Sequence, residues 1–215
     1  MYKKFDSECR RHHIHSYMVA GTLIGSLRHG GYIPWDDDID LVMFREDYNR
    51  LQEIFADSED FELISPADAT DSVFKVLKLQ SKSLTYYDVL GEGFSKKKHL
   101  YLDMLPIDFV PENNMLRKLK GLLFRALDLS HNSSRCYTKF TPHLTYMAKE
   151  SKELRQNLWI RRLIGFPSFI MGPANMYKLM EKLIQSNKKT SKITIAYGVK
   201  GYLGAVSYTH LTLPT

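Results

Sequence analysis

Hydrophobic and polar positions follow two different spacings in the first part of the chain. Residues 3–12 carry charged side chains at a helical density, and Ser16–Ala20 is a short apolar run typical of a buried strand. A second apolar run, Ile39–Phe44, precedes Arg45–Asp57, where large apolar residues recur on one helical face. The pattern predicts a helix, a strand, a second strand and a second helix, in that order.

Short apolar runs continue beyond this point and indicate a sheet. Phe61–Ile64, Val73–Leu79 and Leu84–Val89 each have the length and composition of a strand. The next run, His99–Leu105, alternates and ends at Pro106, which cannot donate a hydrogen bond to a sheet ladder. Strands mixed with helices predict an α/β (mixed α+β) fold.

A helical pattern replaces the strand pattern after Pro111. In Met115–Ser130 one face is apolar and the opposite face is basic, as in an amphipathic helix. The leucines of the apolar face, which we expect to pack inward, are Leu116, Leu119, Leu122, Leu123 and Leu127. The residues of the basic face are Arg117, Lys118, Lys120 and Arg125. This face is expected to be a solvated surface, and contact with a membrane surface is the alternative.

The rest of the chain is predicted to be mainly helical. Residues 144–187 have helical periodicity with breaks at Gly165–Pro167 and Gly172–Pro173, and Lys192–Tyr197 is a further strand candidate. We therefore expect a catalytic core at residues 1–110 and a helical extension at 111–204. Residues 205–215 follow a glycine-rich break without any helical period, and we expect them to be a non-native tail.

Composition narrows the class of protein. The 215 residues are 44% hydrophobic, enough for a substantial core, and the formal charge of +6 suits an anionic partner such as a nucleotide, a phosphorylated glycan or a lipid surface. We expect no nucleic acid partner. The two cysteines, Cys9 and Cys136, are far apart, which argues against a disulfide framework. No apolar run approaches a membrane span, so the expected location is the cytoplasm, with peripheral contact at the inner face of the membrane as an extension.

The aspartates before the second strand are the strongest chemical signal. Because residues two apart face the same side of a strand, Asp38 and Asp40 are expected to project together, and Asp36 can join them. Two carboxylates on one face suit Mg²⁺ or Mn²⁺. Asp37 is expected to point away and to serve the turn. The alternative is an acidic turn that caps a helix or binds calcium incidentally.

A further aspartate, Asp103, interrupts the apolar run Tyr101–Leu105. A buried carboxylate needs a partner, and a metal shared with Asp38 and Asp40 would supply one. Asp103 is also a candidate for the base that deprotonates an acceptor hydroxyl. The competing interpretation is a carboxylate bonded to backbone amides.

Upstream, Gly25 and Ser26 are expected in a turn that opens a short helix, where small residues let a phosphate approach the amide groups. Arg28 and His29 follow as candidate phosphate contacts. A tight turn with a helix cap is the alternative interpretation of the Gly-Ser pair.

Weaker candidates have ordinary explanations. Tyr32 and Trp35 are expected to pack against the protein, with stacking on a nucleotide base as the alternative. Asp108 either caps a turn or supports a neighbouring ligand. The histidines, which suggest a metal tract but are expected to be solvated, are His12, His13 and His15.

Two segments together resemble the LicD family, which is related to fukutin. GTLIGSLRHGGYIPWDDDIDLVM is similar to the family's signature, including the nucleotidyltransferase pattern of Gly25-Ser26 followed by Asp38-x-Asp40. YLDMLPIDFVP resembles its second block, with Asp103 before Pro106. The resemblance covers roughly residues 3–110. The family's usual C-terminal block is not found in this chain.

The resemblance implies a nucleotidyltransferase-like mixed sheet with added helices and a metal-dependent transferase. Members take phosphocholine or ribitol phosphate from a CDP-activated donor, attach it to a hydroxyl of a surface glycan such as lipopolysaccharide or teichoic acid, and release CMP. The acceptor can be a glycan or a lipid-linked glycan. Two alternatives stay open: a nucleotidyltransferase that uses a nucleoside triphosphate and releases pyrophosphate, and a non-catalytic module that binds a nucleotide or glycan.

Overall fold

The computed structural model describes residues 1–36, 38–68, 75–87, 97–138, 148–149, 151–186, 188–198 and 201–207. They form two compact units. Unit 1 contains Met1–Ser65 and Val76–Asp108, and unit 2 contains Pro66–Lys75 and the chain from Phe109 onward. Each unit has its own cluster of buried apolar side chains.

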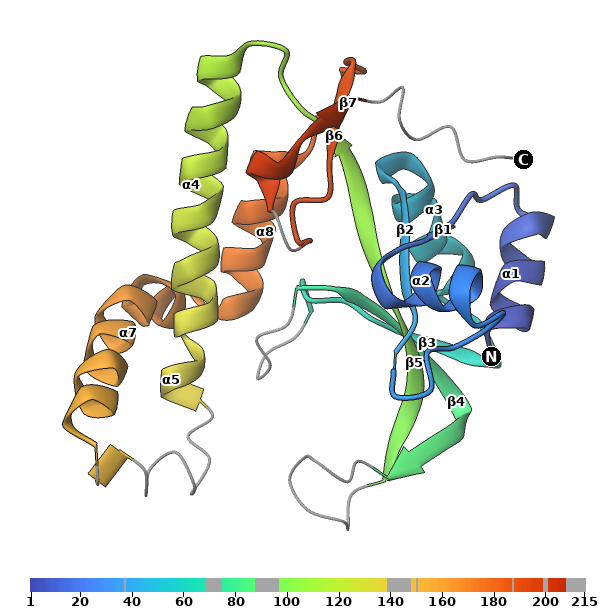
Figure 1. Cartoon of the computed structure of the whole chain (residues 1–215), viewed down its shortest axis with the longest axis horizontal. Coiled ribbons are helices and arrows are strands. Elements are labelled where there is room, and N and C mark those ends of the chain that lie inside the picture. The colour runs from blue at the N-terminus through green and yellow to red at the C-terminus, as the bar shows by residue number, and fades with distance from the viewer. Residues whose placement is uncertain are drawn as a thin grey trace. The chain divides into compact units, whose positions relative to one another are not determined.

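Unit 1 is built on a mixed sheet, as the sequence predicts. Its strands lie in the order β1-β2-β5-β4-β3, with β5 between β2 and β4 (Figure 1). The β2–β5 pair is parallel and the other pairs of this order are antiparallel. The strands are β1 (Tyr17–Met18), β2 (Asp40–Phe44), β3 (Phe61–Ile64), β4 (Leu77–Tyr87) and β5 (Lys97–Phe109).

Three helices complete unit 1, namely α1 (Tyr2–Arg11), α2 (Ala20–Arg28) and α3 (Arg45–Phe55). The helices predicted at residues 3–12 and 45–57 are confirmed. Phe55 of α3 stacks on Phe5 of α1, with ring centroids 5.9 Å apart, and meets Phe61 of β3 edge-on at 5.6 Å. The same core contains the inward side chains of the strands, among them Leu41, Met43, Leu79 and Met104.

The strands around β4 and β5 differ from the prediction. In the described residues a single strand, β4, replaces the two predicted at 73–79 and 84–89, with a register shift between Gln80 and Thr85. Val73, Phe74 and the end of the second predicted strand lie outside the described residues.

Strand β5 continues through Pro106, where the sequence predicted its end. The amide of Asp103 donates to the carbonyl of Ile39, so alternate residues of β5 donate toward β2 and the nitrogen of Pro106 faces the other side. On that side the pairing with β4 ends at Met104. The missing N–H of Pro106 therefore interrupts no ladder.

Unit 2 is mainly helical and also carries two short strands. The helices with bounds in the described residues are α4 (Asn114–Ser133), α5 (Arg135–Thr138), α7 (Lys152–Met171) and α8 (Pro173–Ile184). A 3-10 helix, η1 (Tyr202–Gly204), lies between the strands β6 (Lys192–Thr194) and β7 (Val206–Ser207), which pair with each other. None of the helices traced in these ranges is long and apolar enough to cross a membrane. Residues 208–215 of the expected tail lie outside the described residues.

Two helix predictions in unit 2 are wrong. Helix α7 runs unbroken through Gly165 and Pro167, and the break occurs only at Gly172, before Pro173 opens α8. Pro167 lies on the exposed side, where solvent can replace the hydrogen bond that its ring removes. In α4 four of the five leucines of the predicted apolar face point outward instead of inward, and Leu119 is 66% exposed. Leu127 is half-buried against the core of unit 2, and Gly121 and Phe124 are buried.

Candidate active site

The parallel pairing of β2 with β5 brings the acidic residues together. Asp40 of β2 lies directly opposite Asp103 of β5 in the register, and the amide of Asp103 donates to the carbonyl of Ile39 at 2.9 Å. Asp38 precedes β2 by two residues, so it reaches the site from the segment before the strand. The fold thus joins two acidic segments that are more than 60 residues apart in the sequence.

Asp38, Asp40 and Asp103 converge. Each offers a carboxylate oxygen, and these oxygens all lie within 4.8 Å of one another. All three residues are half-buried. A set of hard, anionic oxygen donors at this spacing fits a divalent cation such as Mg²⁺ or Mn²⁺. In the part of the chain that the structure describes, the histidines His12, His13 and His15 form no comparable group.

The electrostatics of the cluster show that it carries excess negative charge. Burial, followed by repulsion from Asp38, Asp103 and Asp36, raises the pKa of Asp40 to about 6. Burial also raises the pKa of Asp103, although Lys78 opposes this rise through a hydrogen bond and its charge. A cation bound among the carboxylates would relieve this repulsion.

Lys78 is a site residue that sequence analysis did not identify. It lies opposite Asp103 in the β4–β5 register, and its ammonium donates to Asp103 Oδ1 at 2.7 Å. The same ammonium lies 3.6 Å from the centroid of the Tyr101 ring. A charged residue between the buried Leu77 and Leu79 is unusual and could have marked Lys78 in the sequence. Its partner, however, can be identified only when the pairing of β4 with β5 is known.

The Gly25-Ser26 pair does not lie where the sequence predicts. Helix α2 begins at Ala20, so both residues lie in its interior, not in a turn that opens it. The helix end nearest to the acidic strand instead contains Thr22, whose hydroxyl accepts a hydrogen bond from the amide of Asp40 at 2.9 Å. The Ser26 hydroxyl donates to the carbonyl of Leu23 one turn earlier.

Two glycines of α2 allow close packing with the segment that leads to the aspartates. A Cβ on Gly25 would lie 2.5 Å from the carbonyl oxygen of Gly31 and 2.9 Å from the nitrogen of Ile33. A Cβ on Gly21 would lie 2.2 Å from a carboxylate oxygen of Asp36. Gly25 therefore has a structural reason to be glycine, and Asp36 is held against the first turn of α2. Asp37 lies outside the described residues.

The remaining predicted contacts are exposed around the end of α2. Arg28 is its last residue and His29 follows as its C-cap, with both side chains open to solvent. Trp35 is 83% exposed and meets His29 edge-on, with centroids 6.4 Å apart; Tyr32 is 56% exposed. The expectation that Tyr32 and Trp35 pack against the protein is thus wrong.

Asp108 has a different role from the three converging aspartates. It is buried on β5, and its two carboxylate oxygens accept hydrogen bonds from Nε of Arg45 at 2.8 Å and from Nη2 at 2.6 Å. Arg45 opens α3 directly after β2, so this bidentate pair ties β5 to the β2–α3 junction. The predicted turn cap is wrong, because Asp108 lies within a strand.

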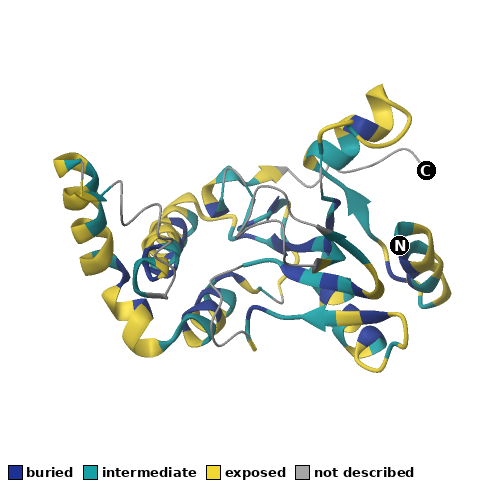
Figure 2. Ribbon diagram, turned by 90° about the horizontal axis from the view of Figure 1, so that it is seen from below, coloured by how far each residue is buried: buried dark blue, intermediate teal, exposed yellow. Residues whose placement is uncertain are grey.

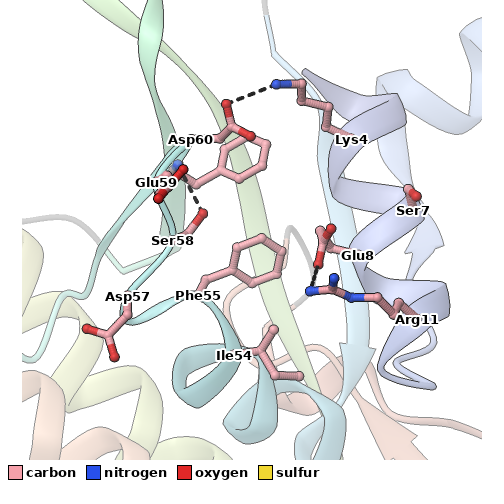
Figure 3. Close-up of a pocket in the computed structure, with 11 residues that line it drawn as sticks. Lys4, Ser7, Glu8, Arg11, Ile54, Phe55, Asp57, Ser58, Glu59 and Asp60 are labelled. Atoms are coloured by element: carbon pink, nitrogen blue, oxygen red, sulfur yellow. Dashed lines mark hydrogen bonds and ion pairs between the residues drawn. The ribbon is translucent and has the colours of Figure 1, made fainter.

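Unit 1 also has a pocket of about 470 Å³ that is separate from the acidic cluster (Figure 3). It lies between α1 and the segment that joins α3 to β3, and its lining is strongly charged. Lys4 pairs with Asp60 at 2.9 Å, and Arg11 pairs with Glu8 at 2.6 Å. Because these charges pair with each other across or along the rim, the pocket is a weaker candidate for chemistry than the three aspartates.

Comparisons with known proteins show which family the chain is similar to. Residues 13–155 match the family model described as LicD/FKTN/FKRP, nucleotidyltransferase domain. The lipopolysaccharide cholinephosphotransferase LicD of Haemophilus influenzae is 32% identical over 107 residues, which are 50% of this chain and 40% of that protein. The human ribitol 5-phosphate transferase FKRP is 28% identical over 102 residues, 47% of this chain and 18% of that protein.

An uncharacterized protein of Rickettsia typhi is 31% identical over 122 residues, 51% of this chain and 34% of that protein. The chain thus spans less than half the length of each of these relatives. No solved structure matches it.

Proposed function

The chain belongs to the LicD/FKTN/FKRP family, and we propose that it transfers a phosphorylated alcohol such as phosphocholine from a CDP-activated donor to a hydroxyl of a cell-surface glycan, with release of CMP. Two relatives support the class of reaction, since one is named a lipopolysaccharide cholinephosphotransferase and the other a ribitol 5-phosphate transferase. The observation that carries the proposal is the convergence of Asp38, Asp40 and Asp103 within 4.8 Å.

In this proposal the three carboxylates hold Mg²⁺ or Mn²⁺. Their oxygen donors suit these ions. Burial raises the pKa of Asp40, and repulsion from the neighbouring carboxylates, which such an ion would neutralise, raises it further. When bound, the ion would offset the charge on the donor's diphosphate and on the departing CMP. Lys78 keeps Asp103 in position through the hydrogen bond to Oδ1.

The transfer needs an acceptor oxygen to attack the distal phosphorus while the bond from that phosphorus to CMP breaks. Asp103 is our candidate for the base that takes the acceptor's hydroxyl proton. It projects from the middle of β5 into the cluster, and Lys78 binds only one of its two oxygens. In the metal-free chain burial raises the pKa of Asp103, so this carboxylate is there a stronger base than an exposed aspartate.

We assign the donor phosphates to the end of α2, where Arg28 is the last residue and His29 the C-cap; Gly25 and Ser26, one turn earlier, lie inside the helix and offer no turn amides to a phosphate. Arg28 and His29 are exposed, and a guanidinium can donate two parallel hydrogen bonds to a phosphate. A hydrogen bond from the amide of Asp40 to the hydroxyl of Thr22 ties α2 to the strand that begins at the proposed metal site.

The proposal is tested by measuring CMP release from CDP-choline and CDP-ribitol with Mg²⁺ and a surface-glycan acceptor. Asp38→Asn and Asp40→Asn should each reduce turnover by about a thousandfold or more, because each removes an anionic ligand of the metal ion that stabilises the transition state. Asp60→Asn is the matched control, because it makes the same substitution in the charged pocket outside the acidic cluster. This variant should retain activity. Full turnover in both site variants would refute the assignment, and pyrophosphate release from CTP would favour the nucleotidyltransferase alternative.

A further inference from the structure

Helix α7 in unit 2 directs its large apolar side chains to solvent. Trp159 is 63% exposed and Ile170 is 68% exposed. Figure 2 shows this helix at the left edge of the view, coloured mainly as exposed. The other exposed apolar residues of α7 are Ile160, Leu163, Phe166, Phe169 and Met171. In a water-soluble helix, residues of this kind normally form the buried stripe.

The fully buried residues of α7 are instead small, namely Gly165 and Ser168, while Leu154, Leu158 and Ile164 are half-buried. Gly165 is buried so closely against α4 that a Cβ would lie 2.5 Å from the carbonyl carbon of Ser133. Ser168, one turn further on, is fully buried. Small residues at a helix contact and large apolar residues on the outside are typical of helices that contact lipid. Lipid solvates the outward apolar side chains, and the small residues let the helix backbones pack closely.

Helix α4 repeats the arrangement. Gly121 and Phe124 are buried, and Leu119 and Leu122 on the opposite side are 66% and 60% exposed. Gly121 again permits close packing, since a Cβ there would lie 2.3 Å from the side chain of Leu203 in η1. The further exposed apolar residues of α4 are Met115, Leu116, Leu123 and Leu129.

Charge on the same two helices is strongly positive. Helix α4 has four basic residues and a single acid, Asp128, which is paired with Lys75 at 2.7 Å. Helix α7 also has four basic residues and a single acid, Glu153, in its first turn. Lys118, Arg125 and Arg161 are exposed beside the apolar faces. An anionic apolar interface complements such a surface better than a neutral one.

We propose that the outward faces of α4 and α7 bind the surface of a lipid bilayer that contains anionic headgroups. The helices lie in the interface, with leucine, phenylalanine and tryptophan side chains among the acyl chains and basic side chains at the phosphates. Neither helix spans the bilayer, in keeping with its length and charge. The inference concerns unit 2 alone and does not depend on the proposed reaction.

Sedimentation with vesicles tests this binding. The complete chain should pellet with vesicles of phosphatidylcholine and phosphatidylglycerol, and several-fold less with phosphatidylcholine alone or at high salt. The double variant Leu163→Gln with Ile170→Gln should reduce partitioning by about tenfold or more, because two large side chains leave the apolar phase. Leu179→Gln, an exposed leucine on α8, is the matched control and should bind as the wild type does.

Fluorescence gives a second measurement that does not depend on sedimentation. The chain has two tryptophans, so Trp35→Phe leaves Trp159 of α7 as the sole reporter. Its emission should shift to the blue when anionic vesicles are added. The proposal is overturned if the wild type stays in the supernatant with both lipids, or if the α7 double variant binds as the wild type does. Dimerisation that the double variant abolishes, without vesicle binding, would assign the face to a second copy instead.

Discussion

The two units depart from the usual partition of polar and apolar groups in opposite directions. Unit 1 gathers three half-buried carboxylates at β2 and β5, where the residues next to Asp40 and Asp103 in the sequence belong to the apolar core. Unit 2 places large apolar side chains on the outside of α4 and α7. Both arrangements cost free energy in water. In our proposals, binding completes the surface of each unit: a cation binds in unit 1 and a lipid interface binds in unit 2.

Within each unit, a neighbouring feature shows how the same residue types behave when they serve stability alone. Asp108 of unit 1 is buried but accepts two hydrogen bonds from Arg45, whereas burial and like charges raise the pKa of Asp40. In unit 2, Met180 is fully buried in the core while Leu163 is 57% exposed. Substitutions distinguish residues that serve stability alone, such as Asp108 and Met180, from residues proposed to bind a cation or a lipid surface, such as Asp40 and Leu163.

The largest expected effect on stability comes from breaking the pair between Arg45 and Asp108. Arg45→Ala removes the cation from a carboxylate that is 1% exposed, and should lower the free energy of unfolding by about 3 kcal/mol. Urea denaturation measures this loss. Lys4→Ala, which breaks the exposed pair with Asp60, should cost less than about 1 kcal/mol. Equal losses in the two variants would show that burial does not distinguish the pairs.

A smaller loss is expected for Gly25→Ala. Alanine favours a helix by about 1 kcal/mol over glycine, but overpacking typically costs about 1–3 kcal/mol, and here the Cβ would meet backbone atoms at 2.5 and 2.9 Å. Because backbone yields less than a side-chain tip, we expect a net loss of about 1–2 kcal/mol in urea denaturation. Gly31→Ala has open space around its Cβ and is the control. A more stable Gly25→Ala protein would contradict the packing.

Removing a charge from the acidic cluster should have the opposite sign. The pKa of Asp40 is about 6 in the folded chain and ordinarily 3.8, so between these values the folded state binds more protons than the unfolded state. The stability of the metal-free protein therefore falls as pH rises through this interval. Asp40→Asn should stabilise the metal-free protein at pH 8 by about 1 kcal/mol, after allowance for solvent screening.

This gain should shrink as the pH falls from about 6 and through 3.8, because Asp40 then becomes protonated in both states. The pH dependence of the urea midpoint, measured in EDTA, checks it. A variant less stable than the wild type at pH 8 would show that the carboxylates do not repel one another.

The smallest effect on stability is expected on the outer face of α7. Leu163→Ala should change the free energy of unfolding by less than about 0.5 kcal/mol, because the side chain is already in solvent. Met180→Ala on α8 is the contrast in the same unit and should cost about 3 kcal/mol. A large loss for Leu163→Ala would mean that this face is covered within the folded chain.

The sequence predicted those parts of unit 1 that follow from local pattern. The helical density of charged residues predicted α1, the apolar stripe predicted α3, and the apolar run after Asp38 predicted β2. The sequence also predicted that Asp38, Asp40 and Asp103 meet, because an aspartate within an apolar strand needs a partner. The same reasoning could not find Lys78, since its contact depends on how β4 pairs with β5.

Prediction was poorest where packing decides between two local possibilities. The leucine stripe of α4 has the period of a buried face, but Gly121 allows η1 to pack on the opposite side, so the stripe is exposed. In α7 the sequence signals of a break, Gly165 and Pro167, are accommodated by a close helix contact and by solvent. The sequence predicted that a helix opens at Gly25-Ser26, whereas α2 begins at Ala20. Its first turn is held to the acidic strand by the hydrogen bond from the amide of Asp40 to the hydroxyl of Thr22.

Isothermal titration calorimetry with Mn²⁺ tests most directly whether the three aspartates form one cation site. The wild type should bind one Mn²⁺ per chain, and Asp103→Asn should weaken binding by about a hundredfold or more, because it removes a charged ligand contributed by a distant strand. Asp60→Asn should bind as the wild type does. Wild-type affinity in a folded Asp103→Asn protein would contradict the account.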